Sequence, residues 1–176
     1  MKQMCDLNKH NQILRHLSEI PGRMISIHGR ENVAAFVLSD LCHENGFNLT
    51  RAAFFVDNPD FDCFKGIAGV HKGDSHGISN VWQDADQYSS YMISSPFNKL
   101  IRSIEQKSMA RNGHDEKEAV HKIAHELNFV QPKHYSWRMK HDNKGIFVFD
   151  HVHGELEELA EHMQNCIHLF SFCPIG

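Results

Sequence analysis

The strongest constraint on the fold is an apolar run late in the chain, residues 146–149, with the sequence IFVF. A strand without a polar face must be covered on both sides, so this run predicts a central strand. The segment before it alternates: Tyr135, Trp137 and Met139 share one face, and polar residues share the other. Residues 142–145 lie between the two segments and have the composition of a turn. We therefore expect a hairpin within a sheet that helices cover.

The spacing of apolar residues places the other elements around this hairpin. Helical spacing, bounded by Pro and Gly, predicts helices over residues 7–20, 33–41, 96–109, 115–127 and 155–165. Short apolar runs predict further strands over residues 24–27, 52–56, 64–70 and 167–172. Residues 71–95 form the longest irregular segment, and long loops in compact domains are often functional.

The resulting order, α-β-α-β-β-α-α-β-β-α-β, predicts the fold class. Hairpins mixed with β-α-β crossovers are typical of an α+β (mixed α/β) fold with a single mixed sheet and helices packed on it. At 176 residues the chain is long enough for one hydrophobic core, whereas two halves would each be short of core. We expect one domain over residues 1–176.

Composition indicates a soluble protein of the cytoplasm. No apolar run reaches the roughly 18 residues that a membrane-spanning helix needs, and the first residues lead into a polar helix rather than a signal peptide. The five cysteines are an odd number without CxxC spacing, which favours a reducing compartment and disfavours a cysteine-held zinc ion. A formal net charge of −4 disfavours a protein that coats nucleic acid.

Fifteen histidines are the unusual feature of the composition, and one group of them ends the apolar strand. In an extended chain His151 and His153 project to the same side, so both rings can reach one metal ion. Asp150 can supply an oxygen ligand or accept a hydrogen bond from a ligating imidazole. A pair of half-exposed surface histidines is the alternative.

A second group, His71, Asp74 and His76, follows another predicted strand and opens the long loop. Gly73 and Gly77 let the backbone fold back, which can bring the three side chains around a cation or a phosphate. The alternative is a solvated, glycine-rich turn.

The two groups together support one hypothesis, a centre for a divalent ion such as Zn, Mn or Fe. With an open coordination position the ion would activate water, so the protein would be a metal-dependent hydrolase. His28, Gly29 and Arg30 lie before a predicted helix N-terminus, where an anionic substrate can be held; an ordinary β-α turn is the alternative. The two histidine groups meet only for some strand orders.

Two other patterns fail as catalytic motifs. His125-Glu126 begins like the zinc-protease HExxH sequence, but Phe129 stands where the second histidine is needed, and His121 and His125 are better explained as an exposed helical pair. Cys42 and His43 are neighbours on a predicted helix, so they point about 100° apart and cannot form a nucleophile and its base.

A competing class is a non-enzymatic binding module for a protein or nucleic-acid partner. The strand around Tyr135 and Trp137 is rich in basic residues, which can contact phosphates or acidic side chains: Lys133, His134, Arg138, Lys140 and Lys144. On a regular strand the two rings point away from Arg138 and Lys140, so they are expected to fill the core. A homo-oligomer formed through Trp82, Tyr88 and Tyr91 is a further possibility, unless these rings also belong to the core.

Overall fold

An antiparallel sheet organises the computed structural model, which describes residues 2–74, 76–113, 115–151 and 156–176. Within these residues the strand order is β3-β2-β1-β5-β4, and every neighbouring pair is antiparallel. The strands are β1 (Leu49–Asn58), β2 (Cys63–His71), β3 (Glu105–Gln106), β4 (Pro132–Arg138) and β5 (Lys144–His151).

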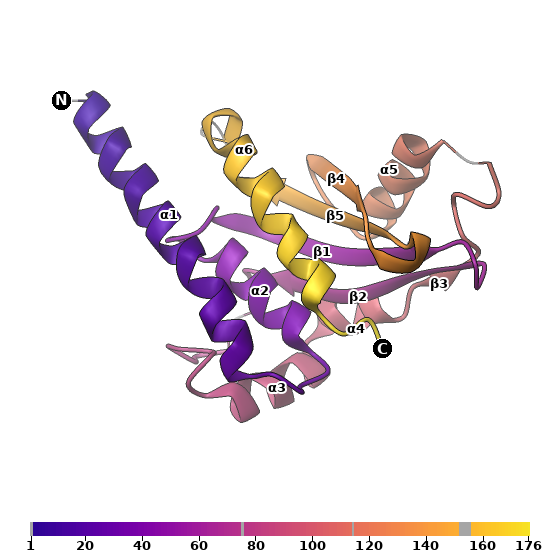
Figure 1. Cartoon of the computed structure of the whole chain (residues 1–176), viewed down its shortest axis with the longest axis horizontal. Helices are drawn as coiled ribbons and strands as arrows, with labels where there is room; N and C mark the ends of the chain where they lie inside the picture. The colour runs from indigo at the N-terminus through magenta and orange to yellow at the C-terminus, as the bar shows by residue number, and fades with distance from the viewer. Residues whose placement is uncertain (1, 75, 114, 152–155) are drawn as a thin grey trace.

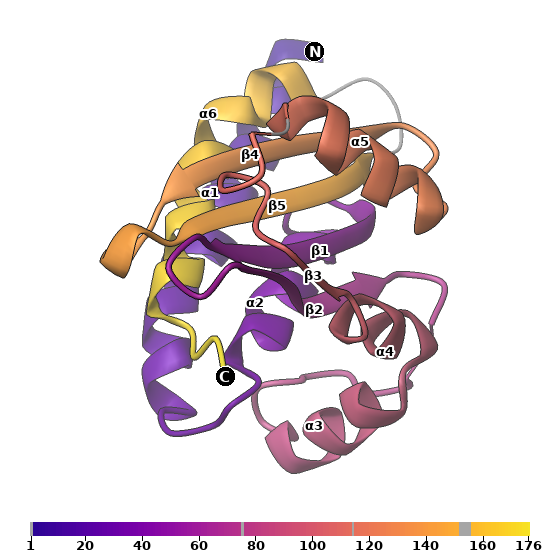
Figure 2. The same ribbon diagram turned by 90° about the vertical axis from the view of Figure 1, so that its right-hand side faces the viewer.

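Helices cover both faces of this sheet, as Figures 1 and 2 show. On one side lie α1 (Lys2–Ser26), α2 (Val33–Cys42) and α6 (Leu156–Cys166), with the 3-10 helix η2 (Ile167–Phe172). On the other side lie α4 (Pro96–Arg102) and α5 (Glu116–Glu126). The remaining helices are α3 (Ala85–Ser94), beyond the β2 side of the sheet, and the 3-10 turn η1 (Lys140–Asp142) before β5. The predicted α+β class with a single sheet is confirmed.

The apolar run in β5 lies between β1 and β4 and is buried on both faces, as predicted. Phe147 and Phe149 contribute to the core beneath α2 and η2, whereas Ile146 and Val148 contribute to the core beneath α4 and α5. Each such side chain stabilises the fold by about 1.5–3 kcal/mol through burial. The two cores explain why the run lacks a polar position.

The alternation in β4 is also confirmed. Tyr135, Trp137 and Met139 pack against the core on the α2 side. Trp137 lies so close to Gly145 on the neighbouring strand that a Cβ atom there would be 2.4 Å from the indole ring. The glycine before the apolar run therefore leaves room for the Trp137 ring to lie against β5.

Helix α1 overturns the predicted strand over residues 24–27, because it continues past Pro21 and Gly22 to Ser26. The physical reason is a continuous apolar stripe at spacings of three and four, formed by Ile13, Leu17, Ile20, Met24 and Ile27. Pro21 and Gly22 lie on the exposed side of the helix. Burial of the stripe offsets the cost of a proline within a helix, about 3 kcal/mol.

The predicted closing strand over residues 167–172 is also wrong, since these residues form η2. Ile167, Phe170 and Cys173 are all buried, and their spacing of three is the repeat of a 3-10 helix. With both of these strands absent, the β-α-β crossovers disappear. The sheet is therefore antiparallel rather than mixed.

The long segment 71–95 contains α3, which the sequence did not predict. Ala85, Tyr88 and Met92 are buried at helical spacing, and Trp82 and Tyr91 pack partly against the same core. Trp82, Tyr88 and Tyr91 therefore belong to the core, which was the stated alternative to their forming an oligomer interface. The helix predicted over residues 96–109 is shorter than expected and ends at Arg102, before β3.

Three expectations about the whole chain concern membrane spans, the number of domains and the location. Within the described residues, no helix has both the length and the apolar character needed to span a bilayer. The single domain and the cytoplasmic location stay predictions.

Candidate functional site

A cavity of about 360 Å³ lies where β2 leaves the sheet, and we call it the β2-end pocket. It is bounded by the C-terminal end of α2, the residues that follow β2, and α3. All three residues of the second predicted group, His71, Asp74 and His76, line it. Its volume is within the range of small-molecule sites, roughly 300–1,000 Å³.

The turn after β2 brings His71 and Asp74 together. The amide of Asp74 donates to the carbonyl of His71 at 2.9 Å. A Cβ atom at Gly73 would lie 2.9 Å from the His71 ring, so glycine leaves room for this imidazole. His71 Nδ1 is 3.6 Å from Asp74 Oδ1, which is an ion-pair distance if the ring is protonated but is too long for a hydrogen bond.

Asp74 is held from the opposite side of the pocket. The Tyr91 hydroxyl donates to the Asp74 carbonyl at 2.7 Å, and the Ser95 hydroxyl is 3.4 Å from Asp74 Oδ2. The carboxylate is therefore fixed in place while its other oxygen remains near His71. About a quarter of the side-chain area of each stays exposed, 31% for His71 and 22% for Asp74.

His76 belongs to the aromatic wall of the pocket. Its ring centroid lies 5.4 Å from that of Tyr88 and 5.0 Å from that of Tyr91. Burial lowers the pKa of His76, which favours the neutral ring. Its Nδ1 accepts a hydrogen bond from the Ile78 amide, so the neutral ring carries its proton on Nε2.

Cys42 also lines the pocket, and sequence reasoning missed its approach to the His71 group. Burial raises the pKa of the Cys42 thiol to about 12, with the Lys72 ammonium partly opposing the shift. The thiol is therefore protonated at neutral pH and is a poor nucleophile.

The topology places the two predicted metal-binding groups at the same end of the sheet. Arg51 of β1 pairs with His71 on one side and with Asp150 on the other. One strand therefore separates β2 from β5, so their ends are about 10 Å apart. This is one of the strand orders that the metal hypothesis needs.

The Asp150 carboxylate already has protein partners. The amide of Val130 donates to one of its oxygens at 2.8 Å and the amide of Gln131 to the other at 2.9 Å. Asp150 thus fixes the start of β4. For His151 the structure describes only the backbone position in β5, and His153 lies outside the described residues.

Among the described residues, no group of three or more His, Cys, Asp or Glu side chains is close enough to hold a metal ion. His71 and Asp74 are a possible pair of ligands, and His76 is turned to the two tyrosines and to its own backbone. The predicted ligands His151 and His153 are among the side chains that the structure does not describe. The metal-ligand assignments stay predictions.

The predicted anion site at His28, Gly29 and Arg30 has a different setting from the one expected. These residues join two helices, α1 and α2, rather than a strand and a helix. Gly29 has a φ of +92°, a conformation that favours glycine. Arg30 donates to the exposed Asp86 at 2.7 Å, so an anion would have to compete with this carboxylate.

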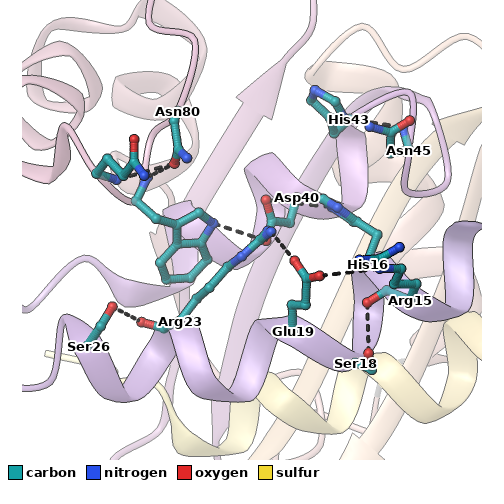
Figure 3. Close-up of polar contacts among 12 residues, drawn as sticks. Arg15, His16, Ser18, Glu19, Arg23, Ser26, Asp40, His43, Asn45 and Asn80 are labelled. Carbon is teal, nitrogen blue, oxygen red and sulfur yellow. Dashed lines mark hydrogen bonds and ion pairs between the residues drawn. The ribbon is translucent and has the colours of Figure 1, made fainter.

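A second polar cluster, which we call the Asp40 cluster, connects α1 to α2 (Figure 3). Asp40 is 5% exposed, and its Oδ2 accepts hydrogen bonds from Arg23 and from the indole of Trp82, each at 3.0 Å. His16 Nε2 is 3.7 Å from Asp40 Oδ1, and the His16 ring stacks on His43. The signal in the sequence was an acidic residue within the buried helix over 33–41, because a buried carboxylate requires partners.

Comparison with known proteins assigns no family to the chain. No protein-family model matches it, and a search of curated proteins finds no similar sequence.

Proposed function

We propose that this chain is a small-ligand-binding protein and that the β2-end pocket holds its ligand. The observation that carries the proposal is the arrangement of His71 and Asp74 at the pocket. They are fixed by the turn and by Tyr91 and Ser95, yet their side chains remain partly exposed and make no hydrogen bond to each other. Positioned polar groups with unused bonding capacity in a cavity are characteristic of binding sites.

The charges around the pocket favour a ligand with a positive group. Glu44 and Asp74 are acidic, whereas Lys72 is the basic residue of the lining and donates to Asn48. With neutral histidines the formal charge of the lining is therefore −1. The rings of Tyr91 and His76 add aromatic surface, which attracts organic cations. An aromatic or apolar ammonium compound fits these features.

A matched pair of probes tests the charge preference. We expect phenethylammonium to shift the ring-proton NMR signals of His71 and His76, and phenylacetate, with a similar ring and opposite charge, to leave them unchanged. Asp74→Asn should weaken binding of the cation about fivefold, the value of a partly exposed ion pair. Asp84→Asn, an exposed aspartate outside the pocket, is the control and should have no effect. Equal binding of both probes, or none of either, would contradict the proposal.

A divalent ion, Zn, Mn or Fe, is the second candidate ligand, and the shared sheet end of β2 and β5 favours it. His71 and Asp74 offer a nitrogen and an oxygen ligand, and His153, which follows β5 in the sequence, is the predicted source of a further nitrogen. When bound with an open position, such an ion would activate water for a hydrolase reaction. An anionic substrate for it, held by Arg30, stays a prediction.

Metal analysis separates the two candidates. Protein purified without a histidine tag should contain one equivalent of metal by mass spectrometry if the second candidate is correct. His71→Ala and His153→Ala should each remove the metal, whereas His121→Ala, an exposed helical histidine, should retain it. Metal-free protein that still binds phenethylammonium supports the first candidate and refutes the second.

A further inference from the structure

The outer edge of β4 is available for another strand. β4 is the last strand of the sheet, and within the described residues it pairs only with β5. An edge strand presents a row of backbone N–H and C=O groups that can pair with an extended segment. A segment that pairs with this edge must be extended, so that its own N–H and C=O groups meet those of β4.

The inner surroundings of β4 hold this edge in a fixed position. Glu116 of α5 accepts a hydrogen bond from the Ser136 hydroxyl at 2.6 Å and also binds Lys144 of β5. His134 Nε2 is 3.9 Å from the same carboxylate. Trp137 is buried against Phe54 and Phe170 on the other face. The edge is therefore ordered before any partner binds, which lowers the entropic cost of binding.

A groove of about 400 Å³ runs between α5 and the start of β4. Its apolar part is formed by Val120, Pro132 and Val148, and exposed residues of both charges lie at its margin: Asp115, Lys117, Glu118 and Lys133. An apolar side chain of an added strand can enter the groove. Alternate residues of a strand share a face, so such side chains would recur at every second position.

The charge along the edge selects the partner. Lys133, Arg138 and Lys140 are exposed on β4 and the turn that follows it, and Asp142, which pairs with Arg138, is the carboxylate that opposes them. In the described part of the chain, Lys133 and Lys140 form no ion pair. The edge thus favours acidic residues.

Two other partners fit less well. A second copy would bring the same basic residues, Lys133, Arg138 and Lys140, along both sides of the seam, and like charges close together are destabilising. A single-stranded nucleic acid would need rings for base stacking. Trp137 is 7% exposed and Tyr135 packs on Phe149, so these rings are committed to the core.

We propose that β4 binds an extended acidic peptide, which adds a sixth strand to the sheet and places an apolar side chain in the groove beside α5. This inference is independent of the β2-end pocket. It identifies an interaction surface and the chemistry of its partner.

The test uses a synthetic peptide of alternating glutamate and valine, titrated into the full chain and followed by amide NMR. We expect slowed hydrogen exchange and shifted signals at the amides of β4, with no change at β3, the opposite edge. The same peptide with alternate backbone amides methylated cannot form the ladder and should not bind. Affinity should fall with added salt, because the charges are exposed.

A charge-reversal pair checks the role of the edge. Lys133→Glu should weaken peptide binding about fivefold or more, whereas Lys107→Glu, an exposed lysine in the loop after β3, should leave it unchanged. Circular dichroism of both variants should match the wild type, since both positions are exposed. Unchanged binding by Lys133→Glu, equal binding of the methylated peptide, or binding of oligothymidylate at β4 in place of the peptide would each overturn the proposal.

Discussion

The Asp40 cluster and the β2-end pocket contain similar side chains, but they differ in what surrounds them. In the Asp40 cluster, Arg23 and Trp82 both donate to a carboxylate that is almost completely buried. In the pocket, His71 and Asp74 lie 3.6 Å apart and both remain partly exposed. A carboxylate whose oxygens already accept hydrogen bonds from the protein stabilises the fold. A carboxylate with an oxygen that still lacks a hydrogen-bond donor can bind a ligand.

The position of each cluster in the sequence explains this difference. Asp40 lies within α2, a helix buried along nearly its whole length, and its partners come from α1 and from the segment before α3. Asp74 lies in the turn after β2, at the end of the sheet, where the C-terminal end of α2 and α3 leave a cavity between them. The comparison leads to four predictions, from the largest expected effect to the smallest.

Removal of the buried carboxylate should have the largest effect on stability. Asp40→Ala leaves the Trp82 indole without its acceptor and removes one of the two carboxylates that Arg23 binds, so we expect a loss of about 2–3 kcal/mol in the free energy of unfolding. Urea denaturation measures it. Asp86→Ala is the matched control, because its ion pair with Arg30 is exposed, and it should change stability little. Equal effects of the two substitutions would remove the distinction between the clusters.

The indole donor alone should contribute less. Trp82→Phe keeps an aromatic ring next to Phe36 but removes the hydrogen bond to Asp40, at a cost of about 1 kcal/mol. Thermal unfolding followed by circular dichroism measures the change. In the Asp40→Ala background the same substitution should cost much less, since the acceptor is already absent; an unchanged cost would show that only packing is involved.

Glu116 is intermediate between the Asp40 cluster and the β2-end pocket. Its carboxylate is partly exposed, yet it interacts with Ser136, Lys144 and His134. Burial raises the pKa of its carboxyl, but Lys144, Ser136 and His134 lower it more, so the pKa lies below its usual value. The ionised form therefore stabilises the folded state at pH values above the unfolded pKa, about 4.3, and this contribution is lost as the pH falls through the folded value. We expect less than about 1 kcal/mol, because Lys144 is exposed to solvent. Urea unfolding from pH 7 to 3 should show this loss in the wild type and a smaller one in Glu116→Gln.

His71→Ala should change stability least and binding most. The imidazole is partly exposed, and none of the described residues donates a hydrogen bond to it, so we expect a change below about 0.5 kcal/mol, as for most surface positions. Binding of phenethylammonium, followed through the His76 ring signals, should nevertheless weaken. A strongly destabilised His71→Ala protein would mean that the pocket, like the Asp40 cluster, serves the fold.

The elements that the sequence predicted well are those whose local pattern agrees with their packing. The β4–β5 hairpin is an example, because the period of two around Trp137 and the unbroken run at Phe147 and Phe149 both reflect burial directly. The predictions failed where a local signal competed with packing. Pro21 and Gly22 indicated an end to α1, but the apolar stripe through Met24 and Ile27 continues the helix.

The candidate site was predictable only in part, for the same reason. The turn chemistry of residues 71–77 placed His71 beside Asp74, since Gly73 leaves room for the ring. The ring contacts of His76 with Tyr88 and Tyr91 depend on α3, which the loop-like composition of residues 71–95 concealed. The approach of Cys42 to this group depends on how α2 crosses β2.

The sequence by itself determined the α+β class, the hairpin of β4 and β5, and the residues of the His71 turn, because periodicity and turn chemistry act over a few neighbouring residues. Only the tertiary structure decided the strand order, the partners of Asp40 and the shared sheet end of β2 and β5. These features depend on contacts between residues distant in the chain, such as Arg51 with both His71 and Asp150, and no short pattern encodes them.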